Sequence, residues 1–464
     1  MLADALRTHP AGVDEAFILI DGLDDALVHG LARIDEDRAA ALESLAAAFA
    51  GSPLADRVAD SVGKIIAGTV TDEHLAVLAG ARAALTGAVH DALLGGLDTA
   101  LGRSRHPGPA APSGPAAAGS PAPAGGGPLL AGGRSWLREL AIAGWRGVDH
   151  EIAGGGAQAV AALLADPAGR RLAVLLDGFA AELRATAPVA TLDRIPVRRW
   201  ADLWSRALLL AQSGFPAVAA EPADGRFLLL GVDLHEHPTV FRAQAHGLLE
   251  TPGGEVRLVR ASVAAAKVDT ISGPSAWRML AAFPVFRAAL AERRAVEITG
   301  MPLTAGGDLL WDESCAVPGE AVDPFALARV RLGKVTAPAT PPLDRHPAVI
   351  AEPVLLEGYT AGPESFDLGG VTLAVDLDRL PEAGPLTPAL VATSTACLGL
   401  LRWESGRWSV QPLAVQAVVR KKPVVAHTGD WALGPTEAKA AKAEAAAGTA
   451  VDVLRERAGR LLRK

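Results

Sequence analysis

The chain has 464 residues, and half of them are apolar, so it is long enough for two to four domains with substantial cores. Its two cysteines, Cys315 and Cys397, stand far apart and exclude a framework of disulfides. No apolar run reaches the roughly 18 residues that span a bilayer, and the first residues, MLADALRTHP, lack the pattern of a secretory signal. We therefore expect a cytoplasmic protein without a membrane partner.

The net charge of −8 lies entirely in the first 133 residues, which carry 16 acidic and 8 basic side chains. An acidic surface repels nucleic acid and anionic membranes. The same charge would also keep an Ala-rich helical bundle soluble, so it does not by itself indicate a partner.

Residues 1–103 are predicted to form an acidic helical bundle. Their helical segments begin at Asp, Ser or Thr and end near Gly, as helix caps require. Residues 104–133 follow as a long disordered linker. The 25 residues from Ser104 to Pro128 hold seven Pro and six Gly, which disfavours both helices and sheets. The linker divides the chain into two unlike pieces.

Residues 134–220 are predicted to be a second helical segment, distinguished by its tryptophans. Trp200, Trp204 and Leu208 recur at four-residue spacing on one helix face, with Arg199 on the neighbouring surface. A stripe of this kind is typical of core packing. Contact with a partner through Arg199, Trp200 and Trp204 is the alternative.

Residues 221–435 change to the two-residue period of strands, which predicts a mostly antiparallel β domain on which the helical segment packs. A helix kinked at Pro284 interrupts it at 275–294, and a basic C-terminal helix follows at 436–464. The fold class is therefore α+β. The expected strands lie at 226–235, 239–250, 255–267, 295–303, 326–335, 353–361 and 370–378, with a long pair at 398–419.

Within that long pair, the Ser-Gly dipeptide at 405–406 predicts a two-residue hairpin turn. The turn places Glu404 opposite Arg407 and Trp403 opposite Trp408. Each such cross-strand pair stabilises a hairpin by about 0.2–1 kcal/mol. Trp403 and Trp408 are also candidates for contact with a partner.

The strongest candidate for chemistry is the segment DLHEHP at 233–238. In strand geometry Asp233, His235 and His237 project from one face, and His246 lies on the next strand. Carboxylates and imidazoles are zinc ligands, so these four residues are the candidate divalent-metal site. A metal-dependent hydrolase is accordingly the first alternative function. A polar sheet edge explains the same pattern, and no other cofactor is expected.

The remaining motifs give no catalytic residue. Gly-Lys pairs at 63–64 and 333–334 precede an apolar residue where a P-loop needs Ser or Thr. Arg420, Lys421 and Lys422 form a basic cluster which, together with the terminal arginines, suits contact with an acidic protein surface or with nucleic acid. Nucleic-acid binding through this cluster is the second alternative function, less favoured because the cluster lacks interleaved aromatic residues.

Four segments resemble an uncharacterised bacterial protein family: RRWADLWSRALLLA (198–211), GVDLHEHP (231–238), DRHPAVIAEPVLLEGYTA (344–361) and STACLGLLRWESGRWSVQPLAV (394–415). The resemblance covers about residues 134–464. Genes of that family lie beside genes for a SWIM zinc-finger protein, a MoxR-type AAA+ ATPase and a von Willebrand A-domain protein.

The resemblance implies an accessory subunit of an ATPase-centred assembly, with the ATPase or the A-domain protein as its partner. The chain has neither a Walker motif nor the CxC and CxH zinc ligands of a SWIM domain. We therefore expect a non-enzymatic adaptor, which would be a partner of the motor and not the motor itself.

Overall fold

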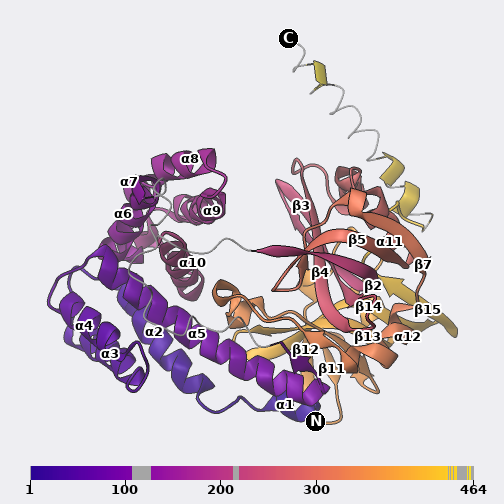
Figure 1. Ribbon diagram of the computed structural model, residues 1–464, viewed down its shortest axis with the longest axis horizontal. Helices are drawn as coiled ribbons and strands as arrows, with labels where there is room; N and C mark the ends of the chain where they lie inside the picture. The colour runs from indigo at the N-terminus through magenta and orange to yellow at the C-terminus, as the bar shows by residue number, and fades with distance from the viewer. Residues whose placement is uncertain are drawn as a thin grey trace.

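The computed structural model describes residues 2–106, 127–212 and 219–436, together with separate residues between 438 and 460. The fold is α+β, as the sequence predicts, with helices on one side and two mostly antiparallel sheets on the other (Figure 1). Residues 107–126 of the predicted linker and most of the predicted C-terminal helix lie outside the described residues. The two ends of the predicted linker are ordered and not disordered as expected, because Ser104–Arg105 form a short strand and a helix begins at Gly127.

Two of the three capped helix starts that the sequence predicts in the N-terminal half are confirmed. The third, α4 (Ala55–Ile66), follows Leu54 and not the predicted serine, and it has no side-chain cap. Asp35 and Thr71 accept hydrogen bonds from the backbone N–H groups of Arg38 (3.0 Å) and His74 (3.3 Å). The α-helices of the helical part are α1 (Leu2–Arg7), α2 (Val13–His29), α3 (Glu36–Ala48), α4 (Ala55–Ile66), α5 (Asp72–Leu101), α6 (Gly127–Ala143), α7 (His150–Gly154), α8 (Ala157–Ala165), α9 (Arg170–Thr186) and α10 (Val197–Leu210).

The two helical segments share one hydrophobic core, to which helices from α2 through α10 contribute side chains. Trp145, Trp200 and Trp204 are fully buried there, and the rings of Trp145 and Trp200 meet edge to face at 6.4 Å. The sequence analysis placed the tryptophan-containing segment on the β domain. Its core packing is instead against the N-terminal helices, because the apolar stripe of α10 faces α2 and α5.

A close backbone crossing fixes how the two helical segments meet. Gly30 follows α2 and Gly144 follows α6, and a Cβ atom on Gly144 would lie 2.2 Å from the backbone nitrogen of Gly30. Both glycines have positive φ angles, 89° and 72°, which other residues rarely adopt. Next to the crossing, the N–H of Leu31 donates to the carbonyl of Ala141 at 2.8 Å.

A buried ion pair links α2 to α5 inside this core. Arg82 donates to both carboxylate oxygens of Asp24, at 2.7 and 3.0 Å, and to the carbonyl of Arg198 at 3.3 Å. The side chains of Arg82 and Asp24 are only 2% and 1% exposed. A buried charge is tolerated only when it is paired, so each partner depends on the other.

We expect Asp24→Asn to lower the free energy of unfolding by about 3–5 kcal/mol, because Arg82 would remain buried without its carboxylate. The matched control is Asp21→Asn, which breaks an exposed ion pair with Arg198 at 2.8 Å and should cost about 1 kcal/mol or less. Urea unfolding of both variants measures the difference. Equal losses in the two variants would contradict the assignment.

The first sheet closes on itself. Its strands follow the order β1-β8-β4-β3-β2-β5-β6, β7 pairs with β5, and β6 pairs back with β4. The strands are β1 (Ser104–Arg105), β2 (Ala220–His237), β3 (Val240–Glu250), β4 (Val256–Ala266), β5 (Arg294–Thr304), β6 (Asp308–Leu309), β7 (Ala316–Ala321) and β8 (Thr336–Ala337).

The second sheet is built around the predicted long hairpin. Its order is β10-β11-β12-β14-β13-β9, with β15 pairing with β14. One face of this sheet packs on α5 and the start of α2 through an apolar cluster that is separate from the helical core. Its strands are β9 (Glu352–Glu357), β10 (Thr360–Ala361), β11 (Ser365–Asp367), β12 (Thr372–Val375), β13 (Ser394–Glu404), β14 (Arg407–Val419) and β15 (Lys422–His427).

The predicted register of that hairpin is confirmed. Trp403 pairs with Trp408 and Glu404 with Arg407, and the two indole rings lie 5.2 Å apart in an edge-to-face arrangement. Both turn residues, 405 and 406, have positive φ, as the turn type requires. The carboxylate of Glu404 takes Arg379 as its ion-pair partner.

Two other sequence predictions are wrong. The strand expected at 326–335 is helix α12 (Pro324–Arg331), in which the side chain of Asp323 caps the N–H of Phe325 at 2.9 Å. The kinked helix expected at 275–294 is a 3-10 segment (Gly273–Leu280) followed by α11 (Pro284–Glu292). In both cases a proline occupies the first helical turn, where its fixed φ favours the start of a helix.

One helix, α5, is long and apolar enough to cross a membrane by length and composition alone. Just over half (56%) of its most apolar window is buried inside the fold, and core helices pass the same test. The helix supplies apolar side chains to the helical core and to the second sheet. This packing accounts for its apolar composition.

Candidate functional site

Two of the four predicted metal ligands, Asp233 and His235, take part in a buried polar contact between the two sheets. Asp233 on β2 is 2% exposed and accepts hydrogen bonds from Arg402 (2.8 Å) and Gln411 (2.7 Å), which lie on β13 and β14. The Nε2 atom of His235 lies 2.9 Å from the same carboxylate. Arg402 also donates to the side-chain oxygen of Gln411 at 2.6 Å. These contacts, called here the inter-sheet clamp, satisfy both oxygens of Asp233.

Electrostatics favour an ionised carboxylate in the inter-sheet clamp. Burial alone would raise the pKa of Asp233, but the hydrogen bond and charge of His235, together with Arg402, outweigh burial and lower it. The two sheets also approach closely at this place. A Cβ atom added to Gly231 would lie only 2.7 Å from the Cβ of Leu413, so the position has no room for a larger side chain.

The four metal candidates do not converge. Asp233 and His235 are in contact, whereas the Nδ1 atom of His237 lies 3.2 Å from the hydroxyl of Thr239 in the exposed turn after β2. His246 on β3 is fully buried and lines a cavity. Within the described residues, no group of three or more His, Cys, Asp or Glu side chains is arranged to hold a metal ion.

We expect Asp233→Asn to lower the free energy of unfolding by about 3–5 kcal/mol, because Arg402 would lose its buried counter-charge. The loss should be the same with and without EDTA. His237→Gln, which changes an exposed side chain, is the control and should cost less than about 0.5 kcal/mol. Near-stoichiometric metal in the purified protein, together with destabilisation of the wild type by EDTA, would support the metal site instead.

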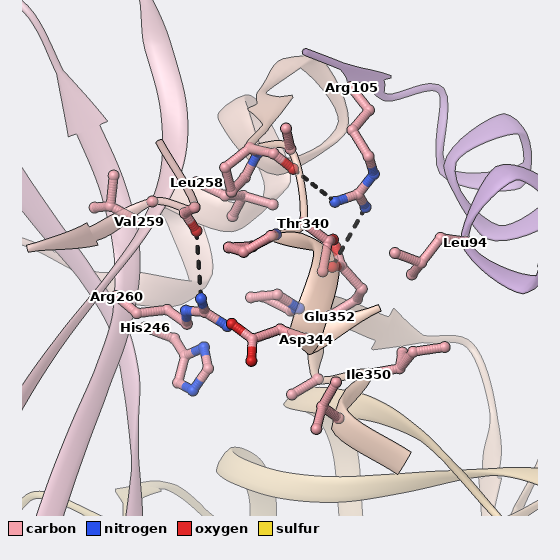
Figure 2. Close-up of a pocket in the computed structure, with 18 of the residues that line it drawn as sticks. Leu94, Arg105, His246, Leu258, Val259, Arg260, Thr340, Asp344, Ile350 and Glu352 are labelled. Carbon is pink, nitrogen blue, oxygen red and sulfur yellow. Dashed lines mark hydrogen bonds and ion pairs between the residues drawn. The ribbon is translucent and has the colours of Figure 1, made fainter. Parts of the chain in front are cut away.

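A small cavity lies where the helical part, the first sheet and the segment 338–353 meet. It has a volume of about 140 Å³. Figure 2 shows Arg105 and Glu352 on one side of the cavity and His246 and Arg260 on the other, with Asp344 between them. These side chains come from β1, β9, β3, β4 and the 3-10 turn Pro342–Asp344, so the site exists only in the assembled fold.

The two arginines of the cavity are anchored by carboxylates. Arg105 donates to both oxygens of Asp98, at 2.8 and 3.1 Å, and to the carbonyl of Pro338. Arg260 donates through Nε and Nη2 to Asp308, at 3.0 Å each. Its Nη1 group donates no hydrogen bond within the described part of the chain and remains available.

Three buried histidines are held neutral in the folded protein. Burial lowers the pKa of His90 to about 4 and the pKa values of His246 and His427 to about 3. Nearby arginines lower all three further, whereas the carboxylate of Asp233 acts in the opposite direction on His246. Among the residues that the structure describes, the Nε2 atoms of His246 and His427 have no hydrogen-bond partner.

These shifts predict acid sensitivity. The unfolded chain takes up protons near pH 6.5 whereas the folded chain does not, so stability is complete above about pH 7 and falls as the pH drops through 6.5 towards 4. We expect a loss of about 4 kcal/mol between pH 7.5 and 5.5, measured by urea unfolding. His427→Met should remove about a third of that loss. An unchanged pH dependence in this variant would contradict the prediction.

The predicted interaction residues divide into two groups. The tryptophans at 200, 204, 403 and 408 belong to apolar cores, and Arg199 pairs with Glu182 beside Trp200. Arg420, Lys421 and Lys422, by contrast, are exposed at the turn between β14 and β15. Val418 and Val419 next to them are 55% and 40% exposed. We call these five residues the hairpin tip.

Nothing in the sequence identifies the cavity. Of its lining residues only His246 is among the sequence candidates, where it is grouped with Asp233, His235 and His237. Arg105, Arg260 and Asp344 lie 80 or more residues apart in the sequence, and no motif links them. Compared with known protein families, curated proteins and solved structures, the chain gives no match.

Proposed function

We propose that the chain is a non-enzymatic adaptor that binds an acidic protein surface through the hairpin tip. It would act as a cytoplasmic accessory subunit of the ATPase-centred assembly that the sequence resemblance implies. A MoxR-type ATPase or a von Willebrand A-domain protein is then the expected partner. Two features of the hairpin tip support this proposal: its backbone conformation and its charged and apolar side chains.

The main support for this proposal is backbone strain at the hairpin tip. Arg420 and Lys421 both have positive φ angles, 51° and 66°, in a two-residue turn where Asn and Gly are favoured. Holding two long side chains in this region costs on the order of 1 kcal/mol or more for each residue. Strain of this kind concentrates at functional positions, and here it directs two cations outward from the fold.

The composition of the tip indicates the kind of partner. Three adjacent cations and two exposed valines suit a protein surface with carboxylates around an apolar centre. Lys422 and Pro423 begin β15, and both residue types protect a sheet edge from pairing with a further strand. The proposed contact is therefore through side chains and not through strand addition.

Nucleic acid fits the tip less well. The tip has no aromatic side chain on which a base could stack, and the whole chain carries a net charge of −8. The metal-dependent hydrolase remains the other alternative, and the EDTA comparison with Asp233→Asn tests it.

The double variant Arg420→Asn/Lys421→Gly separates binding from folding. It relieves the strain, so we expect the free energy of unfolding to rise by about 1 kcal/mol or more. It also removes two cations, so co-purification of the ATPase or A-domain protein with the tagged full chain should fall at least tenfold. Quantitative mass spectrometry of the purified samples measures the loss.

The matched control is Arg33→Ala/Arg194→Ala, which removes the same charge from exposed sites on the helical part. It should retain the partner. Undiminished partner recovery with the tip variant would contradict the proposal. Replacement of the protein partner by co-purified nucleic acid, released steeply by salt, would favour the second alternative instead.

A further inference from the structure

We propose that the cavity between the helical part and the first sheet binds a small zwitterion of the amino-acid class. In this arrangement the ligand's ammonium group meets the carboxylates of Asp344 and Glu352, its carboxylate meets Arg260, and His246 supplies a neutral hydrogen-bonding group. The proposed ligand site is independent of the proposed adaptor function.

One histidine of the cavity wall is buried with an unpartnered ring nitrogen. His246 is 1% exposed and lines the cavity, and its Nε2 atom has no hydrogen-bond partner in the described part of the chain. Protein interiors rarely leave such a group unsatisfied, because the lost hydrogen bond destabilises the fold. A polar ligand that reached this atom would supply the missing partner.

The carboxylates have unused capacity for a cation. The ion pairs of Asp344 with Arg206 and Arg171 are long, at 3.6 and 3.7 Å. Those of Glu352 with Arg105 and Arg103 are 3.3 and 3.5 Å. Charge-assisted hydrogen bonds in proteins are usually 2.7–2.9 Å long, so an ammonium group can approach both carboxylates more closely than their present partners do.

The cavity also offers a donor for an anion. Arg260 is fixed by Asp308, and this leaves its Nη1 group without an acceptor in the described part of the chain. Figure 2 shows this guanidinium above the His246 ring and beside Asp344 in the view. Groups of both signs therefore line one small space, which suits a ligand that carries both charges.

Size and lining restrict the ligand further. A volume of about 140 Å³ is close to that of an engineered apolar cavity that holds benzene, so the ligand has about six or seven non-hydrogen atoms. Leu94, Leu258 and Ile350 supply an apolar wall against which a methyl group can pack. L-alanine, with six non-hydrogen atoms and one methyl group, fits these requirements, and glycine serves as a smaller zwitterionic probe that lacks the methyl group.

Isothermal titration of the full chain tests the proposal. L-alanine and glycine should bind with one site per chain, whereas acetate and ethylamine, which each lack one charged group, should bind at least tenfold more weakly. Saturating L-alanine should also raise the melting temperature, since it would bind only the folded chain. Absence of binding by both zwitterions at millimolar concentrations would overturn the proposal. Equal binding of acetate would overturn it too, because it would indicate a simple anion site.

Two variants test the assigned contacts. Asp344→Asn keeps the shape of the side chain, and Arg260→Lys keeps the charge but loses the free planar N–H group. Each should weaken L-alanine binding at least tenfold. Arg242→Leu, at an exposed position on β3, is the control and should bind normally. Circular dichroism verifies the fold of each variant, and unchanged affinity in a folded Asp344→Asn would contradict the proposal.

Discussion

The rest of the structure depends on one buried carboxylate, Asp233, which the two sheets share. Its own strand, β2, is central to the first sheet, and its partners Arg402 and Gln411 belong to the hairpin at the centre of the second. Because an ionised carboxylate cannot stay buried without its partners, the relative position of the sheets is tied to this contact. Close approach of the backbones at Gly231 adds a steric constraint at the same place.

The position of the sheets in turn determines how the helices meet them. Helix α5 contributes to both the helical core and the apolar face of the second sheet, and Arg103 beyond its end donates to the carbonyls of Leu332 and Pro353. Polar groups from three parts of the chain are thereby enclosed together, with histidines that burial keeps neutral. The cavity is a consequence of this junction, whereas the hairpin tip projects from the far end of the second sheet (Figure 1).

Local patterns in the sequence predicted local structure well. Helix caps at Asp35 and Thr71 and the register of the hairpin at Trp403–Trp408 depend on neighbouring residues, so they could be derived without the fold. Long-range contacts could not. Asp and His alternate in the segment 233–238 as metal ligands on one strand face would. However, the carboxylate of Asp233 accepts a hydrogen bond from Arg402, which lies 169 residues later in the chain. The cavity residues share no motif at all, and only the closed first sheet and the docked helices bring them together.

The most direct measurement is a double-mutant cycle on the inter-sheet clamp, with Asp233→Ala, Arg402→Ala and the double variant compared by urea unfolding. The account predicts a coupling free energy of at least about 2 kcal/mol, because each single variant leaves a buried charge without its partner from the other sheet, and the double variant removes both charges. A coupling within about 0.5 kcal/mol of zero would show that the two side chains act independently, and it would contradict the view that this contact holds the sheets together.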